Sequence, residues 1–217
     1  FGPAPYHQVA NELRGVWSGA LDAGQTYRMS CDVRVPVGGT LIIPAGTRIE
    51  ATGLYNLEVF GRLEIQGTEA ERVVMCNCLV ADLDIWGGLR FFNLDTLNVM
   101  APSVVRYTNF DNYSRIDVME PGVDFEGVRF SGGYEYGVYV ATRSADLADS
   151  VSFRNCTFND CGSYGVWSDS SAVTVRNSLV QNIKGRGISI NAVDIGSEIT
   201  NTVVRACSTS AIALENL

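Results

Sequence analysis

The last third of the chain repeats one pattern three times. The segments that begin at residues 151, 173 and 198 align with an asparagine in one column, at Asn155, Asn177 and Asn201. Counted from that asparagine, an apolar residue follows three positions later, and Gly or Ala followed by Val or Ile comes ten and eleven positions later. A period of about 22 to 24 residues, with short β-branched runs and no helical spacing, is typical of a coil whose successive turns pair strand on strand. The chain is therefore predicted to be all-β, as a parallel β-solenoid.

The same register extends towards the N-terminus. Gly127 takes the asparagine place, and the other matching positions are Phe130, Gly137 and Val138, followed more loosely by Tyr107 and Phe110. Residues 39–49, 56–68 and 84–91 are predicted strand segments with Gly and Pro at several corners. We expect about eight to nine turns in one body over residues 21–217. Residues 1–20 are expected to form an N-terminal cap, in which the stretch HQVANEL could form a short helix.

The N-terminal half carries three motifs that resemble a known superfamily. They are GGTLIIPAGTRI (38–49), L-x-V-x-G-x-L-x-I-x-G-T (57–68) and W-G-G-L-x-F (86–91). Together with the repeats, over residues 15 to 217, they resemble the right-handed parallel β-helix proteins of the pectate-lyase-like superfamily, and most closely its secreted and cell-surface β-helix repeat proteins. The resemblance implies a right-handed coil. It implies no single activity, because lyases, hydrolases, epimerases, adhesins and structural filaments share these motifs.

Composition indicates a folded extracellular module. Hydrophobic residues make up 46% of the 217 residues, which is enough apolar material for a continuous core. The net charge of −8 argues against nucleic acid or an anionic membrane surface as the main partner. No apolar run approaches the length of a membrane span, so no membrane insertion is expected. The first residue is Phe1, which indicates a mature product or an excised piece, and we expect an extracellular or cell-surface location.

Six cysteines leave two interpretations open. Cys156, Cys161 and Cys207 fall in columns otherwise held by small or apolar residues, which favours buried free thiols. A disulfide between Cys156 and Cys161, within one turn, is the alternative. Cys76 and Cys78 share a strand face, and one of them could pair with Cys31. They lack the further ligands of a zinc site, and His7 is the single histidine, so no metal centre is predicted.

The asparagine column is interpreted as structural. Asn at the same corner of successive turns can hydrogen-bond along the stack, and it tolerates the left-handed backbone of a tight corner. Two N-glycosylation acceptor patterns also occur, at Asn112 and Asn155. Asn112 is the better candidate because it lies between turns on an expected exposed bend. Burial in the ladder is expected to argue against a glycan on Asn155.

A strip of aromatic side chains is the strongest candidate for a binding site. If Val166, Ile188 and Ile212 point inward, alternation along the strands sends the following residues outward. This places Tyr139 and Trp167 on adjacent turns, with Ser189 and Ala213 beyond them. Tyr136, Tyr164 and Arg186 come at the preceding corner, and Asp169, Asn191 and Glu215 lie two positions further along the strands. A flat aromatic strip edged by polar groups can stack on sugar rings, although a loop, a neighbouring domain or a second copy could cover it instead.

The same face suggests a catalytic alternative. Asp169 and Glu215, two turns apart, could form the carboxylate pair of an inverting glycosidase. The resemblance implies an Arg or Lys base for a lyase, and Arg186 is the candidate for that role. Arg186 beside Asp169 and Asp194 is the nearest approach to a calcium-dependent lyase site, so calcium is the one cofactor the pattern hints at. The residues carry no Lys-Arg pair beside an acidic calcium cluster and no DD or HG signature, which are the stronger signatures that the resemblance leads us to look for. A polysaccharide-degrading enzyme is therefore the second hypothesis.

The C-terminal end of the sequence favours an assembly role. The final strand of the last turn is followed by no segment that could cover the open core, and solenoid ends are normally closed. The chain is expected either to continue beyond Leu217 or to meet another subunit or domain there. The sequence therefore predicts a rigid, non-catalytic extracellular β-helix module for surface assembly, adhesion or glycan contact.

Overall fold

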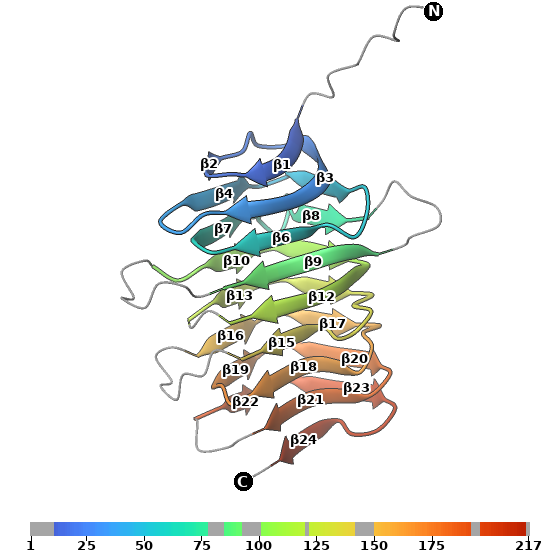
Figure 1. Ribbon diagram of the computed structural model, residues 1–217. Coiled ribbons are helices and arrows are strands. Elements are labelled where there is room, and N and C mark those ends of the chain that lie inside the picture. Colours follow the sequence, from blue (N-terminus) through green and yellow to red (C-terminus); the bar gives the residue numbers. More distant parts are fainter. Residues whose placement is uncertain are drawn as a thin grey trace, which may run out of the picture.

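The protein forms a right-handed parallel β-helix of about seven turns. The computed structural model describes residues 11–77, 85–92, 101–119, 122–141, 150–191 and 196–215. Within these ranges the regular structure is entirely β-strand. Figure 1 shows the turns stacked from β1 (Glu12–Val16) at the N-terminal end to β24 (Ile212–Glu215) at the C-terminal end. The predicted fold is confirmed, whereas the expected count of about eight to nine turns was slightly too high.

Three faces run along the coil, and every turn contributes one strand to each face over most of the length. Face 1 is the eight-stranded sheet formed by β2 (Gly19–Ala20), β4 (Thr40–Pro44), β7 (Arg62–Gln66), β10 (Val104–Arg106), β13 (Asp124–Glu126), β16 (Val151–Arg154), β19 (Val173–Arg176) and β22 (Glu198–Thr200). Face 2 contains β5 (Arg48–Ala51), β8 (Val73–Cys76), β11 (Thr108–Asp111), β14 (Arg129–Ser131), β17 (Thr157–Asn159), β20 (Leu179–Ile183) and β23 (Val203–Cys207). Face 3 contains β6 (Asn56–Val59), β9 (Trp86–Phe91), β12 (Tyr113–Val118), β15 (Val138–Val140), β18 (Tyr164–Asp169), β21 (Arg186–Asn191) and β24.

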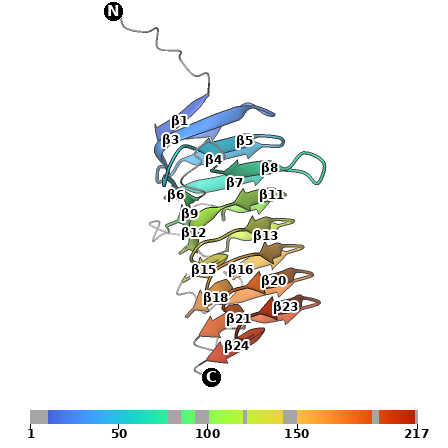
Figure 2. The same ribbon diagram turned by 90° about the vertical axis from the view of Figure 1, so that its right-hand side faces the viewer.

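Faces 2 and 3 join through one long strand at the N-terminal end. The first half of β3 (Thr26–Val35) pairs with β5 and its second half pairs with β6. Strand β1 lies alongside β3 on the other side. Figure 2, turned by 90°, shows the same stack from the side. The described part of the expected cap, residues 11–20, is thus strand and turn, and Glu12 and Leu13 belong to β1 instead of the helix considered for HQVANEL; residues 7–10 of that stretch lie outside the described residues.

The register predicted from the repeats is confirmed residue by residue. The apolar column pairs Phe158 with Val180 and Val180 with Val204 in parallel strands. Phe130 pairs with Phe158, and Phe110 pairs with Phe130, so the looser N-terminal alignment was also correct. The glycines of the later column are required by close stacking: a Cβ on Gly165 would lie 2.6 Å from the carbonyl oxygen of Gly187 on the next turn.

Aromatic rings fill the middle of the coil. Phe130 stacks on Phe158 with centroids 4.6 Å apart, and Phe125 stacks on Phe153 at 5.1 Å. Phe110 continues the first stack at 5.6 Å from Phe130. All five rings are fully buried. Parallel in-register pairing places like residues above one another, and the offset and edge contacts between such rings add stability beyond the area they bury.

The tight corner between faces 1 and 2 uses left-handed backbone on successive turns. Asn155, Asn177 and Asn201 have φ angles of 55°, 53° and 47°. The backbone amide of Asn155 donates to the Arg176 carbonyl, and that of Asn177 to the Thr200 carbonyl. The side-chain amide of Asn201 donates to Asn177 Oδ1 at 2.7 Å. The asparagines therefore stack in one column, as the repeat predicted.

Candidate functional site

The outward column on face 3 brings the predicted aromatic residues together. Tyr139 of β15 pairs directly with Trp167 of β18, and Trp167 pairs with Ser189 of β21. At the preceding corner, Tyr164 pairs with Arg186. This order follows from alternation, because Val138 and Val166 point into the core and the next residue on each strand points outward. The expected column is present, although Ser189 is covered by its neighbours.

The rings form a packed cluster instead of the flat strip expected from the sequence. Trp167 stacks on Tyr164 with centroids 4.9 Å apart and planes 23° apart. Tyr139 lies 4.5 Å from Trp167 with a tilt of 43°, and Tyr136 meets Trp167 edge-on at 6.1 Å. Side chains at the corner can fold back over the sheet, and this brings the rings out of one plane. We call Tyr136, Tyr139, Tyr164 and Trp167 the aromatic cluster.

A groove of about 800 Å³ runs along the corner beside the aromatic cluster. Its aromatic lining comes from Tyr134, Tyr136, Tyr164 and Trp167. Its charged lining comes from Glu135, Lys184 and Arg186. Tyr134 is 71% exposed, so its ring stands free at the edge of the groove. An open groove that mixes aromatic faces with polar and charged groups is suited to a ligand that has both apolar faces and hydroxyl groups.

Tyr136 has a different environment from the one expected. It is only 8% exposed, and its hydroxyl donates to Asp117 Oδ1 at 2.5 Å. Burial, together with the adjacent carboxylate, raises the pKa of Tyr136 well above its usual value, so the phenol keeps its proton. Tyr136 thus supports the groove from behind more than it presents a surface to a ligand.

The three catalytic candidates are tied into side-chain contacts. Arg186 forms an ion pair with Glu215 on the next turn and lies 3.4 Å from Ser189 Oγ. Asp169 Oδ1 accepts a hydrogen bond of 3.2 Å from the Asn191 side chain. Asp169, Asn191 and Glu215 follow one another in register on β18, β21 and β24, as the sequence indicated. The carboxylates therefore share a column, with Asn191 bound to one and Arg186 to the other.

The calcium site stays a prediction. Within the described ranges, no three His, Cys, Asp or Glu side chains come together in a way that could hold a metal ion. Asp194, which the calcium hypothesis used, lies outside the described residues.

The described part of the chain contains no helix with the length and hydropathy of a membrane span.

The two glycosylation candidates have more similar surroundings than expected. Asn112 is exposed with φ of 51°, in line with the predicted bend. Asn155 is also exposed, so the expectation that the ladder buries it was wrong. The physical reason is that the left-handed corner turns the asparagine side chains outward, and the groove of about 530 Å³ along this corner is lined by Asn155, Asn177 and Asn201.

The cysteines divide into one disulfide-bonded residue and four free thiols among the described residues. Cys76 is disulfide-bonded, but Cys31 is free, so the considered Cys31–Cys76 pairing was wrong. Cys156 and Cys161 are free and fully buried, which confirms the preferred interpretation and excludes a bond between them. Cys207 is free and half-buried. Cys78 and His7 lie outside the described residues.

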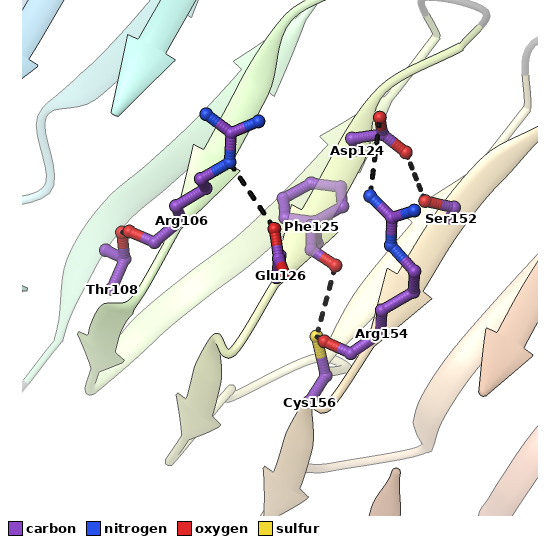
Figure 3. A network of polar contacts seen from close by, with 8 residues as sticks. All are labelled: Arg106, Thr108, Asp124, Phe125, Glu126, Ser152, Arg154 and Cys156. Atoms are coloured by element: carbon purple, nitrogen blue, oxygen red, sulfur yellow. Dashed lines mark hydrogen bonds and ion pairs between the residues drawn. The ribbon is translucent and has the colours of Figure 1, made fainter. Parts of the chain in front are cut away.

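The outward side of face 1 carries acids and bases, whereas Phe125 and Phe153 of its strands are buried in the core. Arg106 Nε lies 3.4 Å from Glu126 Oε2, and Arg154 Nη2 lies 3.7 Å from Asp124 Oδ2 (Figure 3). Beneath them, the Cys156 thiol donates to the Phe125 carbonyl at 3.5 Å (Figure 3). Exposed pairs of this kind contribute little stability each. The described strands of face 1 present no exposed aromatic ring that could stack on a ligand.

Sequence reasoning missed one aromatic and two charged residues of the groove lining, and a fourth residue that supports the groove. Tyr134, Glu135 and Lys184 lie at corners, where the spacing between turns varies and no period fixes the position of a side chain. Asp117 was missed for a different reason. It precedes Tyr139 in the same outward column, pairing with it directly, and extending that column by one turn would have found it.

Two family models match the chain in adjacent regions. One, described as "Right handed beta helix region", matches residues 104–216, and the other, described as "Pectate-lyase like beta helix domain", matches residues 17–106. Searches of curated proteins and of solved structures found no match to the chain. The first match covers more than half of the sequence and contains the aromatic cluster and the asparagine column. The N-terminal part is similar to pectate-lyase-like β-helix domains, and the chain belongs to the right-handed β-helix family.

Proposed function

We propose that this β-helix is a rigid, non-catalytic extracellular or cell-surface module that binds carbohydrate in the groove beside the aromatic cluster. The observation that carries the proposal is the lining of the groove. It combines Tyr134, Tyr164 and Trp167 with charged groups from Glu135, Lys184 and Arg186. Aromatic faces pack against the CH faces of sugar rings, and polar groups at their edges can hydrogen-bond the hydroxyls.

The rigidity of the site supports a binding role. The side chains come from β18 and β21 and from the corners next to them, and these strands are held in register by parallel pairing. Trp167 contacts three tyrosine rings, which restrict its motion before any ligand arrives. A preformed surface loses little conformational entropy on binding, so a modest contact area can still give measurable affinity.

Titration calorimetry with four hexasaccharides tests the proposal. The panel contains the hexamers of cellulose, xylan, mannan and polygalacturonate. We expect the native chain to bind at least one, and Trp167→Ala to weaken that binding about tenfold or more, which corresponds to about 1.4 kcal/mol. Tyr134→Ala should also weaken binding, without a folding cost, because Tyr134 is exposed.

Trp17→Ala is the matched control for these variants. Trp17 is half-buried near the N-terminal end, where its indole donates to the Arg14 carbonyl, and it does not line the groove. Its replacement should leave the affinity unchanged. Absence of binding to all four hexasaccharides, or equal affinities of Trp167→Ala and Trp17→Ala, would contradict the proposal.

The enzyme hypothesis has one observation in its favour. Asp169 and Glu215 stand in the same outward column, with Asn191 between them. Reducing-end release and the absorbance of unsaturated products, measured on the polymers of the same four glycans, decide between binding and cleavage. We expect no product. Product formation that disappears in both Asp169→Asn and Glu215→Gln would replace the binding proposal by a catalytic one.

An assembly role is supported by the last described turn. Val203, Ile212 and Leu214 are large apolar side chains, and each is about half exposed. Contact with a second copy or a neighbouring domain would remove this surface from water. Sedimentation velocity over a range of protein concentrations measures self-association directly, and Leu214→Glu should abolish any that is observed.

A further inference from the structure

We infer that Asp117, which does not line the groove, is the positioning residue of the groove and acts on it through Tyr136. The inference rests on the proposed function where it concerns ligand affinity. Its structural part, the control of the aromatic cluster, stands on the contacts of Asp117 alone.

Asp117 is a carboxylate on the outward side of face 3 that is nevertheless only 3% exposed. It lies in register between Arg90 of the preceding turn and Tyr139 of the following turn. Its Oδ2 atom is 3.1 Å from Arg90 Nε and 3.6 Å from Arg115 Nε. A buried carboxylate is tolerated where donors surround it, and two guanidinium groups hold this one in place.

The second oxygen of the carboxylate reaches towards the groove. Oδ1 accepts the hydrogen bond from the Tyr136 hydroxyl at 2.5 Å. Hydrogen bonds to an ionised acceptor are shorter and stronger than those between neutral groups. The hydroxyl end of the Tyr136 ring is therefore fixed by a group that is itself fixed on a different strand.

Tyr136 transmits this constraint to the ligand-facing rings. Its ring meets Trp167 edge-on at 6.1 Å and lies 5.9 Å from Tyr139. Trp167 and Tyr136 both line the groove, whereas Asp117, Arg90 and Arg115 do not. The order of contacts is thus Arg90 and Arg115 to Asp117, Asp117 to Tyr136, and Tyr136 to Trp167.

The aromatic rings on the two sides of Asp117 along the coil have different partners. On the N-terminal side, Arg34 and Arg90 each cover a ring of the stacked pair Phe60 and Phe92, at 4.8 Å from the centroids. Those rings already have cation and ring partners on their faces. By contrast, Tyr164 and Trp167 of the aromatic cluster stack on each other and line the groove, so their rings are the ones that a ligand in the groove contacts.

Tyr136→Phe tests the inference with a minimal change. It removes one hydroxyl and leaves the ring and the Arg90–Asp117–Arg115 contacts. In a Trp17→Phe background, the indoles are Trp86, which is buried, and Trp167. We expect acrylamide to quench the accessible emission about twice as strongly in Tyr136→Phe as in its parent. We also expect the best-binding hexasaccharide of the panel to lose affinity by about threefold to tenfold, in the range of one hydrogen bond to a charged group.

Tyr27→Phe is the matched control. Tyr27 is buried near the N-terminal end, and its hydroxyl accepts a hydrogen bond from the Asp22 amide at 2.8 Å. This variant should lower the melting temperature to a similar extent while leaving quenching and affinity unchanged. A purely stabilising role of Tyr136 predicts the same result for both variants, and that result would overturn the inference.

A double-mutant cycle assigns the effect to Asp117. Asp117→Asn keeps the size of the side chain but removes the charge that fixes the hydroxyl. In the parent protein, we expect Asp117→Asn to increase acrylamide quenching and to weaken hexasaccharide binding by about threefold. In the Tyr136→Phe background it should change neither quenching nor affinity, because the hydroxyl through which Asp117 acts is already gone. Additive effects would overturn the inference. If no hexasaccharide binds the parent protein, the proposed function fails, while the quenching cycle still decides whether Asp117 positions Trp167.

Discussion

At the scale of single residues, the buried thiols show how the coil changes side-chain chemistry. Burial raises the pKa of Cys156 to about 12 and that of Cys161 to about 11. Both thiols lie in the core, where the thiolate would lose its hydration, so the neutral form is favoured. The two thiols are therefore neutral packing groups in the folded protein, and unfolding lowers the pH at which they ionise.

This difference predicts a loss of stability at high pH. A thiol with a raised pKa in the folded state stabilises it fully below its unfolded pKa of 9.0, and this contribution is lost as the pH rises towards about 12. Between pH 9.5 and 11, Cys156→Ala should reduce the slope of the unfolding free energy by about 1.4 kcal/mol per pH unit. Urea denaturation at each pH measures it. Val175→Ala, which removes core volume without a titrating group, should keep the native slope, and an unchanged slope in Cys156→Ala would contradict the assignment.

Residue-scale prediction from the sequence succeeded where one residue type recurs. The asparagine column was found because Asn155, Asn177 and Asn201 are identical and recur at similar spacings of 22 and 24 residues. A second left-handed column, Asn112, Gly132, Asp160, Asn182 and Ala206, was not found, although it turns the corner between faces 2 and 3. Several residue types occupy it, because neighbouring hydrogen bonds can hold even an alanine in this conformation, and so no repeated letter marks it.

At the scale of the elements, the corners decide how tightly the strands can follow one another. Left-handed backbone turns the chain within one or two residues, so a strand of face 1 leads almost at once into a strand of face 2. Asparagine is favoured there because its short polar side chain tolerates this conformation. The corner is also held by the hydrogen bond between the Asn177 and Asn201 side chains.

Substitution of Asn177 separates the two contributions. Asn177→Ala removes the side-chain hydrogen bond and keeps a β-carbon in left-handed backbone without the polar side chain that helps asparagine tolerate this conformation, and the strain costs about 1–2 kcal/mol. Asn177→Gly removes the same hydrogen bond without this strain. We expect thermal unfolding to give a lower stability for the alanine variant than for the glycine variant by about that amount, and equal stabilities would show that the corner is not strained.

Element-scale prediction was strong for strand pairing and weak for side-chain positions at corners. The repeats fixed the partners of Phe158, Val166 and their successors because alternation and the period act together within a strand. They did not show that the aromatic rings fold into a cluster, since that depends on side-chain angles at Tyr136 and Tyr164 and on Asp117 of an earlier turn.

At the scale of the whole molecule, burial is uneven along the axis. The strands of the middle turns have fully buried inward residues, such as Phe130, Phe153 and Phe158. In the last described turn, Val203, Ile212 and Leu214 remain exposed. Each turn of a solenoid is stabilised mainly by burial against its neighbours, so a turn whose apolar side chains stay exposed opens more easily.

Hydrogen exchange should show this gradient. The amides of β22, β23 and β24 are expected to exchange with an opening free energy about 3 kcal/mol lower than those of β14 and β17. Mass spectrometry of peptides from the two regions measures the difference in one experiment, and the central strands act as the internal control. Uniform protection from β14 to β24 would indicate that the coil opens as one unit.

In-register pairing also means that the coil can change in length only by whole turns. Each turn adds one residue to every column, so duplicating a single coil in the gene would lengthen every face by one step of about 4.8 Å and leave the contacts of the other coils as they are. Loss of one residue inside a strand would instead exchange inward and outward side chains from that point on. Evolution can therefore change the reach of such a surface by whole coils far more readily than by single residues.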